Sequence, residues 1–221
     1  ALIGDDALRE GLKNYFEAHQ YHNATGADLW DALGKAANLD IGAIMKSWLE
    51  QPGYPVIEAK VVDGQLQLSQ QQFFIGDGHD TGRLWQIPLN ANYKEAPQIM
   101  KEQTINLGDY QELRQQEGKP FRLNIGNNSH FIVKYDQTLM NDILDHLDEL
   151  TAIDQRQLLQ DFRLLADGQQ LSYADIIPLL PRFADSHSEI VNTALYAIVN
   201  KLKQFVTPGS AEESALKKFV N

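Results

Sequence analysis

The sequence predicts a multi-domain α+β protein in which a helical segment, an antiparallel β-sandwich and an α-helical, helical-repeat-like region follow one another. Two changes of periodicity predict this order. Apolar residues recur at helical spacing up to residue 52, alternate with polar residues over 53–136, and return to helical spacing over 137–221. Short strands with polar turns and no intervening helices favour an antiparallel sandwich. We therefore expect domains at 1–52, 53–136 and 137–221.

The first segment is predicted to contain three helices. Thr25 and Asp28 have the capping-box spacing, in which each side chain accepts a hydrogen bond from the other residue's backbone amide. Pro52 and Gly53 end the third helix. The apolar positions that define the buried faces of the three helices are Leu8, Leu12, Tyr15 and Phe16, then Leu29, Trp30 and Leu33, then Ile41, Ile44, Met45, Trp48 and Leu49.

The second segment is predicted to contain short strands. Asp63 and Gly64 separate two alternating runs, and both residues tolerate the positive φ of a type I′ hairpin turn. Pro88 indicates an edge strand or a bulge, because proline cannot donate to a strand ladder. The expected strands are the two runs around Ile57–Val61 and Gln65–Leu68, followed by 84–89, 102–107, 121–125 and 131–135.

The third segment is predicted to be helical again. Ser188 is expected to cap one helix, and Ser210 with Glu213 forms a second capping-box pattern. Pro178 and Pro181 predict a short or kinked helix, because proline inside a helix costs about 3 kcal/mol. The apolar positions are Leu139, Met140, Ile143, Leu144, Leu147 and Leu150, then Leu158, Leu159, Phe162 and Leu165, then Val191, Leu195, Ile198, Val199, Leu202 and Phe205, then Leu216, Phe219 and Val220.

Composition excludes several functional classes. The 221 residues contain 19 Lys and Arg against 30 Asp and Glu, a formal net charge of -11 that disfavours nucleic acid and anionic membranes as partners. The absence of cysteine excludes disulfides, cysteine-type zinc sites and thiol catalysis. No apolar stretch approaches the roughly 18 residues of a membrane-spanning helix. The first residues lack a basic and apolar leader, so we expect no signal peptide and a cytoplasmic location.

Two groups of side chains contain residue types that bind metals, but their spacing in the sequence does not match a known metal site. His19 and His22 lie three residues apart, but zinc needs three or four converging ligands, so exposed residues at a fraying helix end are the favoured interpretation. The segment Phe74–Gly82 resembles a calcium loop but lacks the alternating carboxylates and closing Glu of an EF-hand. A polar hairpin loop is the favoured interpretation there.

An acidic group is interpreted in the same way. Asp142, Asp145, Asp148 and Glu149 lie on the helix face opposite the leucines, which predicts a solvated surface and no paired-carboxylate chemistry. The chain also lacks the patterns His-Glu-x-x-His and Gly-x-Ser-x-Gly. We therefore assign no catalytic, substrate-binding or metal-binding residue.

Five motifs follow one another between Asn23 and Asp161. They are Asn23-Ala24-Thr25-x-x-Asp28-Leu29-Trp30-x-Ala32-Leu33 with Trp48-Leu49-x-Gln51-Pro52-Gly53-Tyr54-Pro55-Val56, then Gln70-Gln71-Gln72-Phe73-Phe74, then Trp85-Gln86-Ile87-Pro88-Leu89, then Phe131-Ile132-Val133-Lys134-Tyr135-Asp136, then Asp154-Gln155-Arg156-x-x-Leu159-x-Asp161. In this order they resemble the zinc aminopeptidase N family of gluzincin metallopeptidases. Gln72, Phe131 and Lys134 depart from the family pattern.

The resemblance implies that 1–52 is the tail of a thermolysin-like catalytic domain, 53–136 a β-sandwich and 137–221 the start of a C-terminal helical domain. It also implies a parent hydrolase that removes N-terminal residues from peptides with zinc-activated water. The family's zinc motif and its Gly-x-Met-x-Asn substrate loop do not occur in this sequence. We therefore expect a portion of a larger enzyme that is inactive alone, has no cofactor of its own, buttresses the active site and links it to the helical lobe.

The expected partners are the rest of the catalytic domain, the rest of the helical domain and the parent's peptide substrates. In the isolated chain the helices lack these packing partners, which leaves apolar faces exposed. We therefore expect the isolated chain to self-associate. The alternative is an autonomous β-sandwich binding module for a peptide or glycan. Trp85, Tyr93 and Tyr110 would form its stacking platform, although aromatic residues in such strands are more often core.

Overall fold

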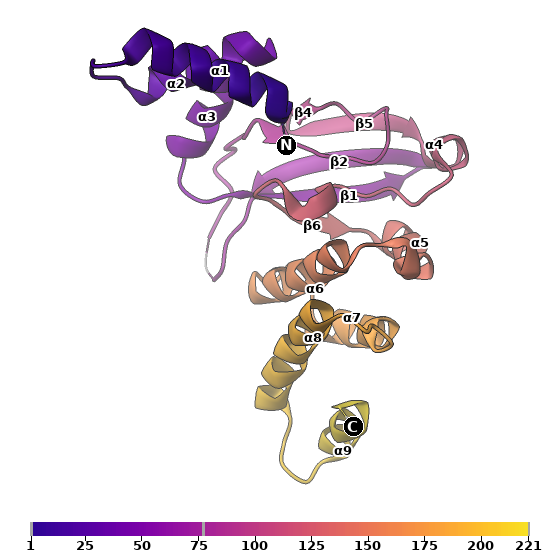
Figure 1. Cartoon of the computed structure of the whole chain (residues 1–221). Coiled ribbons are helices and arrows are strands. Elements are labelled where there is room, and N and C mark those ends of the chain that lie inside the picture. Colours follow the sequence, from indigo (N-terminus) through magenta and orange to yellow (C-terminus); the bar gives the residue numbers. More distant parts are fainter. Residues whose placement is uncertain (1, 77, 221) are drawn as a thin grey trace.

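Helices lie at the two ends of the chain, and a β-sheet lies between them, in the computed structural model (Figure 1). The structure describes residues 2–76 and 78–220, without the side chains of 212, 215, 219 and 220. The predicted apolar positions Phe219 and Val220 therefore lie outside the described side chains. The mixture of helices and strands confirms an α+β protein, and the division into domains at 52 and 136 stays a prediction.

Three helices form the N-terminal end, as predicted. They are α1 (Gly4–His19), α2 (Gly26–Ala37) and α3 (Ile41–Leu49). The capping box of α2 is confirmed, because the Thr25 hydroxyl accepts from the Asp28 amide and the Asp28 carboxylate accepts from the Thr25 amide at 2.8 Å. Gly11 allows α1 and α2 to pack closely, since a Cβ there would lie 2.9 Å from the Leu33 Cα.

Four strands form the main sheet in the order β5 (Thr104–Asp109), β2 (Gln65–Gln72), β1 (Pro55–Val62) and β6 (Ile132–Tyr135). The predicted hairpin is confirmed, because β1 pairs antiparallel with β2 and the turn residues Asp63 and Gly64 have φ of 50° and 80°. Among the residues that the structure describes, a second sheet pairs β3 (Ile87–Pro88) with β4 (Ile99–Met100). Pro88 thus lies in a two-stranded sheet, where every strand is an edge.

The predicted purely antiparallel arrangement is wrong. β6 pairs parallel with β1, with Val56 opposite Ile132, and alternation along one strand carries no information about its neighbour's direction. The described residues form one four-stranded and one two-stranded sheet, which does not confirm the predicted sandwich. The strand expected over 84–89 is reduced to Ile87–Pro88, and the one expected over 102–107 lies at Thr104–Asp109.

The segment 121–125 is not a strand. Asn124 adopts a left-handed φ of 54°, which interrupts extended backbone, while its amide still donates to the Leu89 carbonyl at 2.9 Å. A helix that the alternation did not predict, α4 (Tyr110–Glu117), follows β5. Asp109 caps its start by accepting from the Glu112 amide at 3.0 Å, and Gly118 ends it with φ of 67°.

The C-terminal region is helical, as predicted. Its α-helices are α5 (Gln137–Asp145), α6 (Ala152–Asp167), α7 (Tyr173–Ile176), α8 (Glu189–Leu202) and α9 (Ala211–Val220). Short 3₁₀ helices lie at Ile125–Asn127, Leu147–Glu149, Ile177–Phe183 and Lys203–Phe205. Pro178 and Pro181 lie in the 3₁₀ helix that directly follows α7, which confirms the predicted short helix.

The two predicted serine caps have different outcomes. Ser188 occupies the N-cap position of α8 without a side-chain hydrogen bond. The Ser210 hydroxyl accepts from the Glu213 amide at 3.2 Å, as expected of a cap. The Glu213 carboxylate accepts from the Gly209 amide at 2.8 Å, one residue before the partner that a capping box requires.

One continuous apolar core joins the sheet to the C-terminal helices. It extends from Ile57 in β1 to Leu202 in α8. The N-terminal helices have a separate, smaller cluster around Leu33, Ile41 and Ile44. Trp48 packs against both clusters. The C-terminal helices are therefore built onto the sheet. The helices α1–α3 attach through the end of α3 and through Gln98, whose side chain donates to the Leu2 carbonyl at 3.0 Å.

Candidate functional site

The candidate metal and carboxylate groups do not form a centre in the part of the chain that the structure describes. No group of three His, Asp or Glu side chains there could hold a metal ion. His22 is exposed and His19 is half-buried against Tyr15, with ring centroids 5.2 Å apart. The same described residues include no helix long and apolar enough to cross a membrane.

Asp142 does not belong to a solvated face, contrary to prediction. Its carboxylate accepts from the Tyr110 hydroxyl at 2.6 Å and from the Arg114 Nε at 2.7 Å. Burial opposes ionisation, but the hydrogen bonds from Arg114 and Tyr110 outweigh it and lower the pKa of Asp142. The prediction failed because both partners lie on α4, which the alternation did not reveal. Asp145, Asp148 and Glu149 are exposed, as expected.

The proposed aromatic platform lies inside the protein. Trp85, Tyr93 and Tyr110 are 0%, 2% and 7% exposed, and all three belong to the main core. A stacking platform for a sugar or peptide must present its rings to solvent. These three residues therefore form no stacking platform, and the alternative of a binding module stays a prediction.

The first junction attaches the N-terminal helices to the sheet region. It consists of Ser47, Trp48 and Gln51 at the end of α3, with Leu84 and Gln86 before β3. The Trp48 indole donates to the Gln86 carbonyl at 2.9 Å, and the Gln86 amide donates to the Ser47 hydroxyl at 3.0 Å. The Gln51 side chain donates to the Leu84 carbonyl at 2.9 Å. Together these bonds fix the orientation of α3 relative to the sheet.

A buried glutamine fixes the segment that carries this junction. Gln70 in β2 is 2% exposed, and its amide accepts from the Trp85 backbone amide at 2.9 Å. It also donates to the Trp85 and Glu102 carbonyls, each at 3.0 Å. The side chain thus replaces strand pairing where residue 85 runs past β2 without forming a ladder. Because Gln86 follows Trp85 directly, Gln70 positions the first junction.

The second junction attaches the sheet to the C-terminal helices through three aspartates: Asp136, Asp154 and Asp161. Asp136 caps α5 by accepting from the Leu139 amide at 2.8 Å, and its other oxygen accepts from the Val61 amide at 2.7 Å. Asp161 in α6 accepts from the Val133 amide of β6 at 3.2 Å. One carboxylate therefore links β1 to α5, and another links β6 to α6.

Asp154 is the most highly connected member of the second junction. It is 6% exposed, and it accepts from the Gly126 amide and the Thr151 hydroxyl, each at 2.9 Å. Arg122 forms an ion pair with it at 3.4 Å, with both side chains largely buried. The first turn of α6 is thereby held to the loop that precedes β6.

Replacing Asp161 by asparagine is expected to change how stability depends on pH. Burial raises the pKa of Asp161 well above its ordinary value, so the native state keeps a proton that the unfolded chain releases. The contribution of Asp161 to stability is then fully present below about pH 4 and falls by at most about 1.4 kcal/mol per pH unit as pH rises to the native pKa. Asp161→Asn removes this slope, so its stability relative to the wild type should increase with pH.

Urea unfolding of both proteins at steps from about pH 4 to about pH 8 measures this difference. The exposed Asp148→Asn is the matched control for loss of one carboxylate. A difference between Asp161→Asn and wild type that stays constant with pH would contradict the prediction.

The chain is similar to a known family model at its start and to individual relatives over its whole length. The Peptidase family M1 domain matches residues 1–48. Aminopeptidase N of Lactobacillus helveticus is 62% identical over 219 residues, which are 99% of this chain and 26% of that protein. Aminopeptidase N of Lactobacillus delbrueckii subsp. lactis is 57% identical over 100% of this chain, again 26% of the relative. The chain belongs to the M1 peptidase family.

A more distant relative has the same coverage. Aminopeptidase N of Lactococcus lactis subsp. lactis (strain IL1403) is 40% identical over 99% of this chain and 26% of its own length. This M1 chain thus spans about a quarter of the length of the curated relatives it matches. The resemblance inferred from the motifs is confirmed.

Several motif residues of this M1 chain lie in the two junctions. Trp48, Gln51 and Gln86 make the first junction, while Asp154 and Asp161 belong to the second. The sequence identified these motifs without showing their roles, because each hydrogen bond joins segments far apart in the chain.

The departing residue Gln72 also lies at the edge of the first junction. Its side chain donates to the Pro52 carbonyl and accepts from Arg83, each at 3.2 Å. An amide can donate and accept at once, which an arginine at this position cannot.

Proposed function

We propose that this chain is a non-catalytic part of a zinc-dependent aminopeptidase whose full-length form removes N-terminal residues from peptides. Residues 1–52 then end the thermolysin-like catalytic domain, and 137–221 begin the helical domain. The intervening region supports the active site and links it to the helical lobe. The observation that carries this proposal is that the family motifs supply the two junctions, while no described group of side chains fits a zinc site.

Zinc in the full-length enzyme would supply an activated water for peptide hydrolysis. The described residues of this chain do not fit that metal, so we assign them no part in the chemical step. Their proposed role is positional. The junction hydrogen bonds and the core shared by the sheet and C-terminal helices make this region a stiff support. A cytoplasmic location agrees with the absence of cysteine.

The experiment compares the isolated chain with the full-length enzyme that contains it. After dialysis the isolated chain should hold no stoichiometric zinc and release no product from an aminoacyl-anilide, because a catalytic zinc needs three protein ligands placed together. The full-length enzyme should hold stoichiometric zinc and release product from the aminoacyl-anilide. Trp48→Ala in that enzyme should lower turnover while zinc content is retained, since the first junction loses its indole.

One tightly held zinc per isolated chain, with turnover above the blank, would contradict the non-catalytic assignment. Unchanged turnover of the full-length Trp48→Ala enzyme would instead contradict the supporting role. Leu49→Ala is the matched control, because it is the neighbouring residue on the same helix and makes none of the hydrogen bonds of the first junction.

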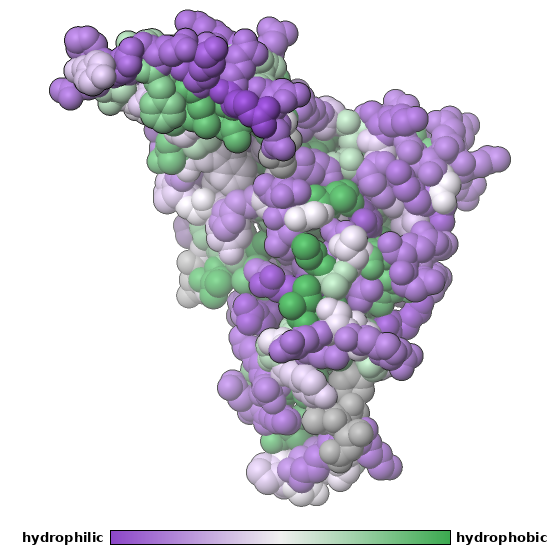
Figure 2. Space-filling model, in the orientation of Figure 1, coloured by the Kyte–Doolittle hydropathy of each residue, from purple (hydrophilic) through white to green (hydrophobic). Residues whose placement is uncertain are grey.

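Self-association of the isolated chain is proposed to occur through α1. Figure 2 shows apolar side chains gathered on the N-terminal helical group. Phe16 is 63% exposed on α1, and Tyr21, just after it, is 97% exposed. Burying one large apolar side chain is worth roughly 1.5–3 kcal/mol, which favours a partner in spite of the net charge of -11.

Light scattering over a concentration series should therefore show an average mass that rises above 25.0 kDa. Phe16→Glu should reduce this rise. Phe205→Glu changes an equally exposed ring near the other end of the chain and should leave it unchanged. A strictly monomeric wild type at all concentrations would refute the proposal.

A further inference from the structure

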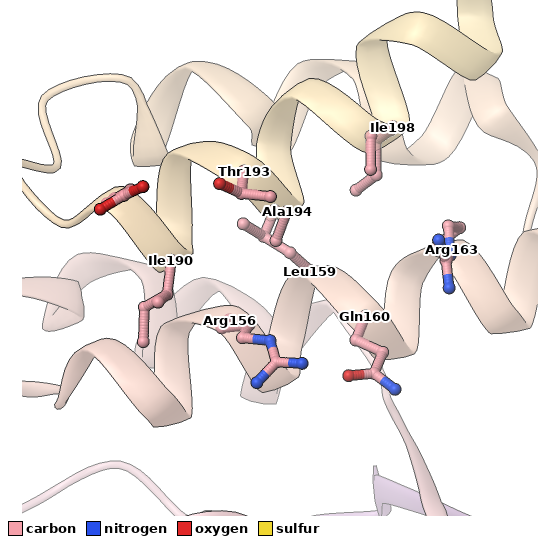
Figure 3. A pocket seen from close by; sticks show the side chains of 10 residues that line it. Arg156, Leu159, Gln160, Arg163, Ile190, Thr193, Ala194 and Ile198 are labelled. Atoms are coloured by element: carbon pink, nitrogen blue, oxygen red, sulfur yellow. The ribbon is translucent and has the colours of Figure 1, made fainter.

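A groove of about 540 Å³ lies between α6 and α8. Figure 3 shows Arg156, Gln160 and Arg163 along α6, with Ile190, Thr193 and Ile198 along α8. Its floor is apolar, because Leu159 and Ile198 are buried beneath it. Ile190 is 42% exposed at its side. The groove therefore combines an apolar base with guanidinium groups at its rim.

The two arginines of this groove differ from all others in the chain. The sequence contains seven arginines, and the other five each contact the side chain of an Asp or Gln: Arg9 with Asp6, Arg83 with Gln72, Arg114 with Asp142, Arg122 with Asp154, and Arg182 with Asp145. Arg156 and Arg163 form no ion pair or hydrogen bond with any described residue. Two unpaired arginines therefore lie on the same helix in a chain with 30 acidic residues.

The spacing of these arginines defines the ligand geometry. Seven residues separate them on α6, which is about two helical turns or roughly 10.5 Å along the axis. Both side chains therefore lie on nearly the same face of the helix. A guanidinium binds a carboxylate through two parallel hydrogen bonds. A matching ligand carries two carboxylates about 10 Å apart and apolar groups between them.

We propose that this groove binds an acidic amphipathic helix of a protein partner, with two carboxylates spaced two turns apart. Such a helix repeats the spacing of Arg156 and Arg163, because both elements have the same rise per residue. A groove between two packed helices accepts a third helix by ridge-into-groove packing. Its apolar face covers Ile190, Ala194 and Ala197, the apolar side chains of the groove that stay accessible. This site is independent of the supporting role proposed for the two junctions.

Charge selects this occupant over a nucleic acid. The net charge of -11 repels a phosphate backbone at long range, whereas two localised carboxylates need only the short-range field of the two arginines. Glu189 also lines the groove, and it disfavours a densely charged ligand. A helix with few, correctly spaced carboxylates satisfies both conditions.

The test uses a synthetic helical peptide with glutamates seven residues apart and leucines between them, titrated against the 221-residue chain. In one control peptide both glutamates are replaced by glutamine. In the other the two glutamates are three residues apart. We expect binding of the first peptide and at least about tenfold weaker binding of both controls. The double substitution Arg156→Gln with Arg163→Gln should weaken binding of the first peptide by a similar factor. Arg9→Gln with Lys13→Gln removes the same charge from α1 and should not.

A charge-reversal experiment tests the proposal even if the variant with two glutamines does not fold correctly. Arg156→Glu with Arg163→Glu should bind the peptide in which lysines replace the two glutamates, and circular dichroism verifies the helices of each variant. Equal binding of the glutamate and glutamine peptides would overturn the proposal. Equal binding of the two glutamate spacings would overturn the helical occupant, as would loss of binding in the Arg9 and Lys13 variant.

Discussion

Replacing Asp154 by alanine is expected to lower the free energy of unfolding by about 3–5 kcal/mol, which is the cost of leaving one member of a buried ion pair unpaired. The substitution leaves Arg122 without its carboxylate and removes the acceptor of the Gly126 amide and the Thr151 hydroxyl. Urea unfolding monitored by circular dichroism measures the change.

The matched control is Asp148→Ala, a substitution of the same kind at an exposed position on the preceding 3₁₀ helix. It is expected to change stability by no more than about 0.5 kcal/mol. Equal effects of the two substitutions would show that Asp154 does not hold α6 to the loop before β6.

Replacing Gln70 by leucine is expected to destabilise the protein by about 3 kcal/mol or more. Leucine fills a similar volume but leaves the Trp85 amide without an acceptor and the Trp85 and Glu102 carbonyls without a donor. Each buried polar group left unsatisfied costs about 1–3 kcal/mol. Hydrogen exchange at Trp85 and Gln86 should accelerate more than exchange in β1, because the loss is local.

Gln67→Leu is the control on the same strand. Gln67 lies on the opposite face of β2, is half-exposed, and its side chain makes no hydrogen bond with a described residue. We expect a change within about 0.5 kcal/mol. If Gln67→Leu lowered the free energy of unfolding as much as Gln70→Leu, the strand would require polar residues in general and not Gln70 in particular.

Local features of the fold were predictable because their causes lie within a few residues. The Thr25 cap and the Asp63-Gly64 turn depend on hydrogen bonds and dihedral angles between neighbours. The direction of β6 was not predictable, because its partner β1 is 76 residues earlier in the chain (Ile132 against Val56). The signals for α4 were present in Asp109 and Gly118, but the alternating residues before them concealed a helix of two turns.

The roles of the junction residues were not predictable from the sequence. The family motifs include Trp48, Gln86 and Asp154, but nothing in the sequence shows that an indole bonds a carbonyl 38 residues away. Asp142 was misinterpreted because its partners lie on the helix that was missed. The sequence does not show that Arg156 and Arg163 lack acidic partners among the described residues. This becomes clear only from the structure, which shows the partners of the other five arginines.

The parallel pairing of β1 with β6 also affects how the chain folds during synthesis. β1 lies in the interior of the finished sheet, yet only its β2 side is filled when the first hairpin emerges. At about 5–20 residues per second, the 76 residues from Val56 to Ile132 take roughly 4–15 s to be made. For that time the nascent chain has an unpaired apolar edge, which is the kind of surface on which chains aggregate. We expect chaperones that hold unfolded chains to contact ribosome-bound chains that end before Ile132, and to release those in which β6 has emerged.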